Sequence, residues 1–364
     1  MPNMRIFVYE FLTGGGLLDE GGAAADVQSL HDEGAAMVAA LAGDFAALSE
    51  VEVTILRDAR SPLVTPPGVR VCEVASGESE KRAFASAAAE ADWTVVIVPE
   101  LDGRLVERCS LVAESGGRLL GTSDRGLAIA CDKHATAEHL RTAGVASPRG
   151  WAIDASATWP ALVRYPAVIK PRDGAGSQGV RLLRAAPERL LSATPFSPPE
   201  RIPGWGQAGY RLEEFCPGEA VSVALVCGPD GQFALPPCRQ KLSQDGRFVY
   251  LGGSLPVAPD LANRAASLAK RAVAALPGAL GYVGVDLVLG ADHDGGNDFV
   301  IEINPRLTTS YIGLRVVARE NLAAALLDVA EGRRPRLSFA ADRVEFDAMG
   351  SVRVGALAAT YDTT

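Results

Sequence analysis

The sequence predicts an open α/β lobe followed by an α+β region rich in antiparallel strands. Strand and helix signals alternate over about the first 120 residues, which is typical of a βαβ lobe. Closely spaced strand signals follow a stretch punctuated by Pro148, Pro160 and Pro166. With 364 residues, of which 48% are hydrophobic, the chain is long enough for two or three packed lobes with full cores.

The first lobe is predicted to span residues 1–122. Strands are expected at residues 5–9, 51–56, 94–98 and 118–120, and helices at residues 26–48, 83–91 and 101–115. The 26–48 segment places apolar residues at helical spacing. The 94–98 segment is continuously apolar, as a buried strand of a parallel sheet is.

The remaining chain is divided by prediction into three parts. Residues 123–210 are expected to hold linker helices over 124–145, ending at Gly144, and a first subdomain with strands at 167–170 and 179–183. Residues 211–340 are expected to form a second subdomain with strands at 211–215, 221–226, 248–251, 282–289 and 298–303 and helices at 261–276 and 314–331. Residues 194–199, with three prolines, are expected to be a loop, and residues 341–364 a tail.

Charge and cysteine content restrict the functional classes. A net charge of −9 argues against a general nucleic-acid surface. The six cysteines include no CxxC pair, so we expect reduced thiols and a cytoplasmic protein, with a catalytic thiol as the alternative. No apolar run is long enough to span a membrane, and no signal peptide is recognisable.

Oxygen-donor side chains occur on two neighbouring apolar strands near the C-terminal end. Glu302 and Asn304 alternate with apolar residues and therefore point the same way, and Asp286 lies on the preceding strand. The Gly/Asp/Asn-rich segment between the strands predicts a hairpin, which would bring the three groups together. Such groups suit Mg²⁺. The alternative is a solvent-facing hairpin surface.

A lysine and a glycine-rich loop follow another apolar strand. Lys170 ends the strand, and the loop after it contains Gly174, Gly176, Ser177 and Gly179. Backbone amides of such a loop can face a polyphosphate, and the lysine supplies a positive charge. A strand follows the loop, so it is not a Walker loop. The alternative is a glycine-rich hairpin turn with an exposed lysine.

Two weaker patterns accompany these. A strand–turn–strand segment could present backbone groups to a planar base and a carboxylate to a sugar; it contains Glu213, Glu214, Phe215, Cys216 and Glu219. In the linker, Lys133 follows Asp132 at the start of a predicted helix. An exposed helix lysine is the alternative there.

The order and spacing of these four patterns resemble the ATP-grasp superfamily, whose members clamp ATP between two α+β subdomains and convert a carboxylate to an acyl phosphate that an amine attacks. The resemblance implies ATP and Mg²⁺ (or Mn²⁺) as cofactors. It places Lys133 and Lys170 on the ATP phosphates, residues 174–179 in the phosphate loop, and residues 213–216 at the adenine. It also implies that Asp286, Glu302 and Asn304 bind metal and that Arg306 faces the γ-phosphate or the acyl phosphate.

The sequence departs from the family at two positions. The glutamate that binds the ribose in many members aligns with Ala220 in this sequence. The neighbouring Glu219 is the candidate for that role. Gly284 stands where D-alanine–D-alanine ligases have an arginine. Arg239 and Lys241 are candidates to supply the missing charge, with ordinary strand-surface cations as the alternative.

A narrower resemblance links the chain to tyramine–glutamate ligases, which act in methanofuran biosynthesis, a pathway related to that of bacterial methylofuran. The similarity lies in residues 9–11, Gly21, 121–123, 218–222, 239–240, 252–253 and 302–309. It implies a γ-glutamyl amide bond to tyramine or tyrosine. Because the amine must lose a proton, Glu10, near the loop of Gly14, Gly15 and Gly16, is a candidate to bind or orient it, with a strand-end surface acid as the alternative. Small-molecule partners and a homodimer are expected. The alternatives are another amino-acid or peptide ligase, an ATP-grasp kinase and a non-catalytic nucleotide-binding module.

Overall fold

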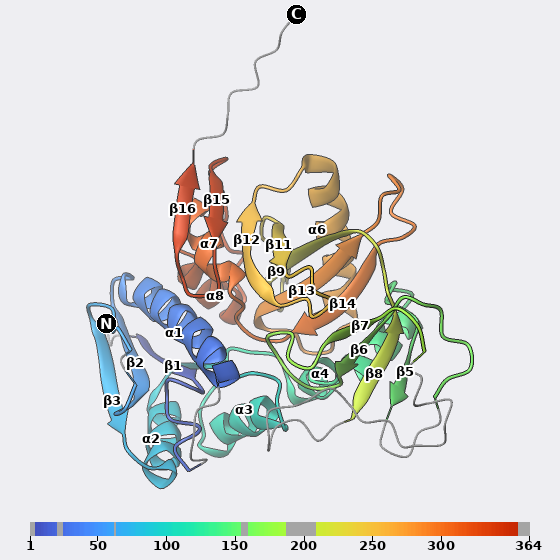
Figure 1. Ribbon diagram of the computed structural model, residues 1–364. Coiled ribbons are helices and arrows are strands. Elements are labelled where there is room, and N and C mark those ends of the chain that lie inside the picture. The colour runs from blue at the N-terminus through green and yellow to red at the C-terminus, as the bar shows by residue number, and fades with distance from the viewer. Residues whose placement is uncertain (1–3, 20–24, 62, 154–158, 187–208, 356–364) are drawn as a thin grey trace, which may run out of the picture.

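The computed structural model describes residues 4–19, 25–61, 63–153, 159–186 and 209–355. Three sheets organise these residues, one in each of three lobes (Figure 1). The loop predicted at 194–199 and Gly21 lie outside the described residues. Within the described part of the chain, no helix is long and apolar enough to cross a membrane.

The N-terminal lobe is a four-stranded parallel sheet in the order β3-β2-β1-β4. Side chains alternate along β1, so Ile6 and Val8 pack against α1 while Phe7 and Tyr9 pack against α2 and α3. The elements are β1 (Met4–Glu10), α1 (Ala25–Ala46), β2 (Val51–Asp58), β3 (Val69–Val74), α2 (Gly77–Glu90), β4 (Trp93–Ile97) and α3 (Arg104–Glu114). Strand β3 is not among the predicted strands, and the strand predicted at 118–120 is only a bridge between Thr94 and Leu119.

Two short helices lead from this lobe to a small antiparallel sheet in the order β5-β8-β6-β7. Helix α4 (Asp124–Ala130) ends at Cys131, and Asp132 then caps α5 (Lys133–Thr142) by accepting hydrogen bonds from two backbone amides. The strands are β5 (Gly150–Ile153), β6 (Ala167–Pro171), β7 (Arg181–Leu183) and β8 (Tyr210–Glu214).

The third lobe is an eight-stranded sheet with helices on both faces. Along β9, Val221, Val223 and Leu225 pack against α6, whereas Ala224 and Val226 belong to the core that holds α7 and α8. The strands are β9 (Glu219–Gly228), β10 (Gly231–Ala234), β11 (Cys238–Leu242), β12 (Tyr250–Leu255), β13 (Gly281–Leu289), β14 (Phe299–Asn304), β15 (Arg343–Phe346) and β16 (Val352–Gly355). The helices are α6 (Pro259–Ala275), α7 (Ser310–Val317) and α8 (Leu322–Ala330).

Helix α1 joins the first lobe to the third, because it packs against α7 and α8 as well as against its own sheet (Figure 1). Asp44 on α1 accepts a hydrogen bond from the Tyr311 hydroxyl at 2.7 Å and forms an ion pair with Arg315. The residues of α1 that face away from the sheet are therefore held in a fixed relation to the third lobe.

The structure corrects the predicted boundaries of the second half. Residue 211 does not open a subdomain, because β8 pairs with β6 in the small sheet. Part of the predicted 341–364 tail is not a tail, since β15 pairs with β12 and β16 pairs with β15. The helix predicted at 314–331 is two helices, because Ala318 is extended and the Asn321 side chain caps α8.

Candidate active site

A cavity of about 270 Å³ lies where the three lobes meet. Its walls come from β6 and the glycine-rich loop after it, from β8 and the residues that follow, from β9, β11, β13 and β14 of the large sheet, and from α1 and the ends of β1 and β4. Most candidate residues from the sequence lie on these walls: Glu10, Lys133, Lys170, Gly174, Gly176, Ser177, Glu213, Glu214, Phe215, Cys216, Asp286, Glu302, Asn304 and Arg306.

The hairpin β13–β14 brings the three predicted metal-binding groups together. In its register Asp286 lies opposite Glu302, and Gly284 lies opposite Asn304, so all three side chains share one face. Asp286 accepts hydrogen bonds from the Asn304 amide at 3.0 Å and from the Gln240 amide at 2.8 Å. This face lines the cavity, which contradicts the alternative of a solvent-facing hairpin.

The two carboxylates of this hairpin differ in electrostatic environment. Burial and the neighbouring Glu302 charge raise the pKa of Asp286 to about 7. Burial also acts to raise the pKa of Glu302, but the charges of Lys133 and Lys170 outweigh it, so the pKa of Glu302 is lowered. The two carboxylates lie close together, and little positive charge lies beside Asp286. A divalent cation bound here would reduce the repulsion between them.

The donor set is mixed. In the described ranges of the chain, no group of three or more His, Cys, Asp or Glu side chains is placed to hold a metal ion. Two carboxylates and an amide oxygen are present instead, and a hard cation held by so few protein groups takes its other ligands from water or phosphate. The residues therefore fit Mg²⁺ or Mn²⁺ bound together with a nucleotide.

The glycine-rich loop is anchored at its start to the N-terminal lobe and to helix α5. The Gly174 amide donates to the Glu100 carbonyl at 2.5 Å, and the Gly174 carbonyl accepts from the Lys133 ammonium at 2.6 Å. Positive φ angles at Gly174, Gly176 and Gly179, and also at Ser177 (φ 58°), turn successive amides of the loop in ways that a regular strand does not allow. Gly179 does not line the cavity, but its backbone shapes the loop.

Lys133 connects the loop to the β13–β14 hairpin, because its ammonium also lies 3.2 Å from the Glu302 carboxylate. Burial acts to lower the pKa of Lys133, but Glu302 and Glu100 outweigh it and raise that pKa. The side chain is therefore a largely buried cation that contacts both the glycine-rich loop and the β13–β14 hairpin. It is not an exposed helix lysine.

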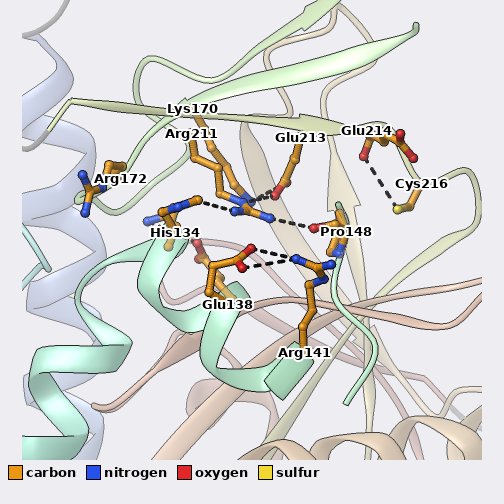
Figure 2. A network of polar contacts seen from close by, with 12 residues as sticks. His134, Glu138, Arg141, Pro148, Lys170, Arg172, Arg211, Glu213, Glu214 and Cys216 are labelled. Atoms are coloured by element: carbon orange, nitrogen blue, oxygen red, sulfur yellow. Dashed lines mark hydrogen bonds and ion pairs between the residues drawn. The ribbon is translucent and has the colours of Figure 1, made fainter. Parts of the chain in front are cut away.

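Lys170 belongs to a buried polar network that Figure 2 shows. Its ammonium lies 2.5 Å from one carboxylate oxygen of Glu213, whose other oxygen accepts from Arg211 at 2.7 Å. Arg211 is fully buried, donates to the Pro148 carbonyl at 2.6 Å and lies 2.8 Å from His134 Nδ1. Strands β6 and β8 thus position Lys170 through the side chain of Glu213.

The segment after β8 forms the apolar end of the cavity. The Phe215 and Phe248 rings are stacked with centroids 6.2 Å apart, and both line the cavity with Val168 and Leu287. The amides of Glu214 and Phe215 are bonded to the Arg149 and Pro166 carbonyls, and the Cys216 amide has no recorded partner among the described residues. A flat slot with a free amide at its edge suits a purine base.

Three predicted site residues lie on the opposite face of their strands. Arg239 and Lys241 are exposed, and Arg239 forms an ion pair with Glu219 at 2.7 Å outside the cavity. Because side chains alternate along a strand, Gln240 and Ala220 line the cavity in place of their neighbours. Arg239 and Lys241 therefore agree with the alternative of ordinary strand-surface cations, and the prediction that Glu219 contacts the sugar of the nucleotide is corrected.

The structure also corrects the prediction of an amine site near β1. Gly14, Gly15 and Gly16 do not line the cavity, and the space beside them is filled by the Tyr9, Leu18, Val74 and Phe11 side chains. Glu10 reaches the cavity, but its carboxylate accepts hydrogen bonds from the Leu12 amide and from the Thr13 amide and hydroxyl. Glu10 therefore stabilises the turn after β1.

Glu100, which is not among the site residues predicted from the sequence, holds the Arg306 side chain in position. Its guanidinium pairs with Glu100 at 2.7 Å, and both side chains are nearly buried. The Arg306 Nε atom is buried without a hydrogen-bond partner among the described residues, and Arg306 lines the cavity. Burial acts to lower the pKa of Arg306, but Glu100 and Glu302 raise it.

The alternative of a catalytic thiol is not supported by the environment of the cysteines. All six are free. Burial raises the pKa of Cys109, Cys216, Cys227 and Cys238 to about 12 and raises that of Cys131 further. Thiols with raised pKa values hold little of the nucleophilic thiolate at neutral pH.

Comparisons with known proteins agree with this geometry. The model of the ATP-grasp domain matches residues 130–310, and that of the pre ATP-grasp 3 domain matches residues 51–126. The chain is 26% identical over 261 residues to the tyramine–L-glutamate ligase of Methanocaldococcus fervens, covering 70% of this chain and 71% of that one. It is 25% identical over 256 residues to the ligase of the same name from Methanocaldococcus jannaschii, covering 70% and 68%.

Solved structures share the fold. An ATP-grasp superfamily protein from Archaeoglobus fulgidus superposes with a TM-score of 0.66 at 24% identity, covering 94% of this chain and 92% of that one. The L-amino acid ligase of Bacillus licheniformis superposes with a TM-score of 0.64 at 14% identity, covering 95% and 79%. The predicted ATP-grasp fold with a preceding α/β lobe is thus confirmed. The chain belongs to the ATP-grasp superfamily and is an ATP-dependent ligase that forms a C–N bond.

Proposed function

We propose that the protein joins the γ-carboxylate of L-glutamate to the amine of tyramine or tyrosine, releasing ADP and phosphate. The substrate class rests on the two tyramine–L-glutamate ligases that match about seven tenths of the chain. The same matches support a role in making a cofactor of the methanofuran or methylofuran type.

One observation carries the chemistry. Lys133 contacts both the carbonyl of Gly174 in the glycine-rich loop and the carboxylate of Glu302 on the β13–β14 hairpin. The phosphate loop and the metal-binding side chains therefore face each other across one buried cation. A triphosphate placed between them would meet positive charge and amide donors on one side and metal-binding oxygens on the other.

The reaction follows from these positions. A γ-carboxylate oxygen of glutamate attacks the γ-phosphorus of ATP, and the bond to the bridging oxygen of ADP breaks. The amine nitrogen then attacks the carbonyl carbon of the resulting acyl phosphate, and phosphate leaves with the electron pair of the C–O bond. Lys133, Lys170 and Arg306 reduce the repulsion between two anionic reactants, and each comes from a different element around the cavity.

Asp286, Glu302 and Asn304 would hold Mg²⁺ or Mn²⁺. A bound divalent cation would neutralise charge on the transferring phosphoryl group. The side chains of Gln240 and Asn304 hold Asp286 in place by hydrogen bonds, so the carboxylate is oriented before any ligand arrives.

The glycine-rich loop has a second role in the proposal. An acyl phosphate reacts readily with water, and a loop that covers the cavity excludes it. The loop is held at Gly174 by the Glu100 carbonyl and Lys133. Bonds from the N-terminal lobe and from helix α5 therefore fix the start of the loop.

A screen of phosphate release tests the proposal. L-glutamate is incubated with MgATP and a panel of amines, including tyramine and tyrosine, and product masses are measured. The expected result is one condensed product per phosphate released. Absence of any condensed product with tyramine or tyrosine would remove this substrate assignment, and a stable phosphorylated product without amine would indicate a kinase.

A matched pair of variants tests the proposed metal site on the β13–β14 hairpin. Glu302→Ala is expected to abolish amine-dependent ADP release, because it removes a metal-binding carboxylate and leaves Lys133 without its partner. Asp294→Ala, in the exposed turn of the same hairpin, is the control and should retain activity. Normal turnover in Glu302→Ala would contradict the metal assignment.

We further propose a cytoplasmic location and a homodimer. Free thiols at all six cysteines suit a reducing compartment. Size-exclusion chromatography with light scattering measures the oligomeric state directly.

A further inference from the structure

One face of helix α1 lines the cavity on the side of the N-terminal lobe. Its cavity-lining residues are Leu30, Glu33, Gly34 and Met37. Their spacing of three, four and seven residues puts them on one stripe of the helix. The stripe holds a single carboxylate between two long apolar side chains, one turn before it and one turn after it.

Glu33 differs from most of the carboxylates that line the cavity. Among the described residues, its carboxylate has no hydrogen-bond or ion-pair partner, a property that it shares with Glu214 at the apolar end of the cavity, whereas Glu10, Glu213, Asp286 and Glu302 each have one or more. It is also half-buried, so solvent screens its charge only in part. A carboxylate in this situation is suited to a cationic ligand.

The helix is held close to the cavity by the residue next to Glu33. A Cβ atom at Gly34 would lie 2.5 Å from the carboxyl carbon of Glu10, so the helix packs directly on that group. A Cβ atom at Gly176 would lie 2.9 Å from a methyl group of Leu30, so the stripe also touches the phosphate loop. Glu33 is therefore fixed beside the region where the γ-phosphate is proposed to lie.

We infer that Glu33 binds the ammonium group of the amine substrate, while Leu30 and Met37 form the walls for its aromatic ring. The ligand class is an arylalkyl ammonium ion, which has a positive charge at one end and a flat apolar group at the other. The inference deepens the proposed function and rests on it. It assigns to Glu33 the role that the sequence pattern had suggested for Glu10.

Glu33 also lies in the electrostatic field of Arg306, which is one of the charges that act on its carboxylate. Arg306 is the proposed partner of the acyl phosphate, so an amine bound at Glu33 would be near the carbonyl that it attacks. Burial raises the pKa of Glu33 to about 7, against the opposing effect of Arg306. This supports transfer of one ammonium proton to Glu33 before attack.

The step balances with groups already present. One proton passes from the ammonium nitrogen to Glu33, and the freed lone pair forms the N–C bond. The C–O bond to phosphate breaks with its electron pair on the phosphate oxygen. The second proton of the attacking nitrogen leaves with that phosphate.

The test separates formation of the acyl phosphate from attack by the amine. Hydroxylamine is neutral at pH 7.5 and traps an acyl phosphate as a hydroxamate without an ammonium site. Glutamyl hydroxamate is measured without tyramine, and the tyramine amide is measured by mass, for the wild type, Glu33→Gln and Glu33→Asp. Asp32→Asn is the control, since Asp32 lies outside the cavity and bonds to Gln28 at 2.8 Å.

The expected result is a rise of about 10- to 100-fold in the KM for tyramine in Glu33→Gln, which is the usual effect of losing a hydrogen bond to a charged group. Hydroxamate formation should stay at the wild-type rate. Glu33→Asp should recover part of the tyramine affinity, and Asp32→Asn should match the wild type in both assays.

Two results would overturn the inference alone. One is an unchanged KM for tyramine in Glu33→Gln while the wild type makes both products. The other is an equal loss of hydroxamate and amide in that variant, which would indicate a structural role. A wild-type protein that forms neither product would contradict the proposed function, and the inference would fail with it.

Discussion

Replacement of Glu213 by glutamine tests how the cavity holds its positive charge. The Glu213 carboxylate is the shared partner of Lys170 and Arg211, at 2.5 Å and 2.7 Å. The side chains of Lys170 and Glu213 are each 5% exposed, and that of Arg211 is 0% exposed. Glutamine keeps the shape, but it removes the negative charge and turns an NH₂ group toward one of the two cations.

The loss of stability expected in Glu213→Gln follows from this burial. Removing one partner of a buried ion pair costs about 3–5 kcal/mol, because the remaining charge is left without compensation. Arg211 keeps the Pro148 carbonyl as an acceptor, so we expect the lower end, about 3 kcal/mol. Typical domains are stable by only about 5–15 kcal/mol, so the change is a large fraction of the total.

Urea unfolding with and without MgATP measures the effect. The ATP phosphates bring negative charge to Lys170, so ATP should offset part of the loss in Glu213→Gln. Glu138→Gln is the matched control, because Glu138 pairs with Arg141 in the same region but both are almost half exposed (Figure 2). The control should change stability by less than about 1 kcal/mol. Equal effects of the two substitutions would refute the reasoning.

Three further predictions follow from the geometry of the cavity. Lys133→Met should weaken ATP binding about 10- to 100-fold in calorimetry, because a buried charge-assisted contact is lost; unchanged affinity would count against its place at the phosphates. Gln240→Ala should lower ligase activity, because Asp286 loses an orienting hydrogen bond, whereas Lys241→Ala should match the wild type; the reverse order would contradict the assigned strand faces. Cys216→Ser should retain turnover, and alkylation of Cys216 should be slow at pH 7 and speed up about tenfold per pH unit as the thiolate fraction grows toward a pKa of about 12; rapid labelling at pH 7 would contradict the raised pKa.

The grouping of Asp286, Glu302 and Asn304 on one face of the β13–β14 hairpin could be predicted from the sequence because its determinants are local. Glu302 and Asn304 are two residues apart, which puts them on one face, and a short polar turn returns the chain to the strand that carries Asp286. The observed register, with Asp286 opposite Glu302, agrees with this prediction. Local periodicity and turn chemistry are sufficient to predict that these three side chains lie together.

Two alternatives are open for the cations Arg239 and Lys241 of β11, and the sequence carries a signal that decides between them. Cys238, Gln240 and Leu242 alternate with Arg239 and Lys241, and Cys238 and Leu242 are the apolar partners of the Gln240 face. A shift of one residue moves every side chain of a strand to the opposite face. The alternation along β11 therefore favours Gln240, and not its charged neighbours, as the side chain that faces the cavity.

Glu33 and Glu100 could not be found from sequence, because their roles depend on how lobes pack. Glu100 meets Arg306 over a separation of 206 residues, and no local pattern joins them. Glu33 appears in the sequence as one of several acids on an amphipathic helix. Only the packing of α1 against the third lobe turns its face toward the cavity.

Transfer of oxygen from glutamate to phosphate tests the central claim most directly. L-glutamate labelled with ¹⁸O in its γ-carboxylate is incubated with MgATP and tyramine, and the released phosphate is analysed by mass spectrometry. The account predicts one ¹⁸O atom in each phosphate, because the carboxylate oxygen that attacks ATP leaves with the phosphate. Unlabelled phosphate formed together with the amide, or ¹⁸O found in AMP, would contradict activation through an acyl phosphate.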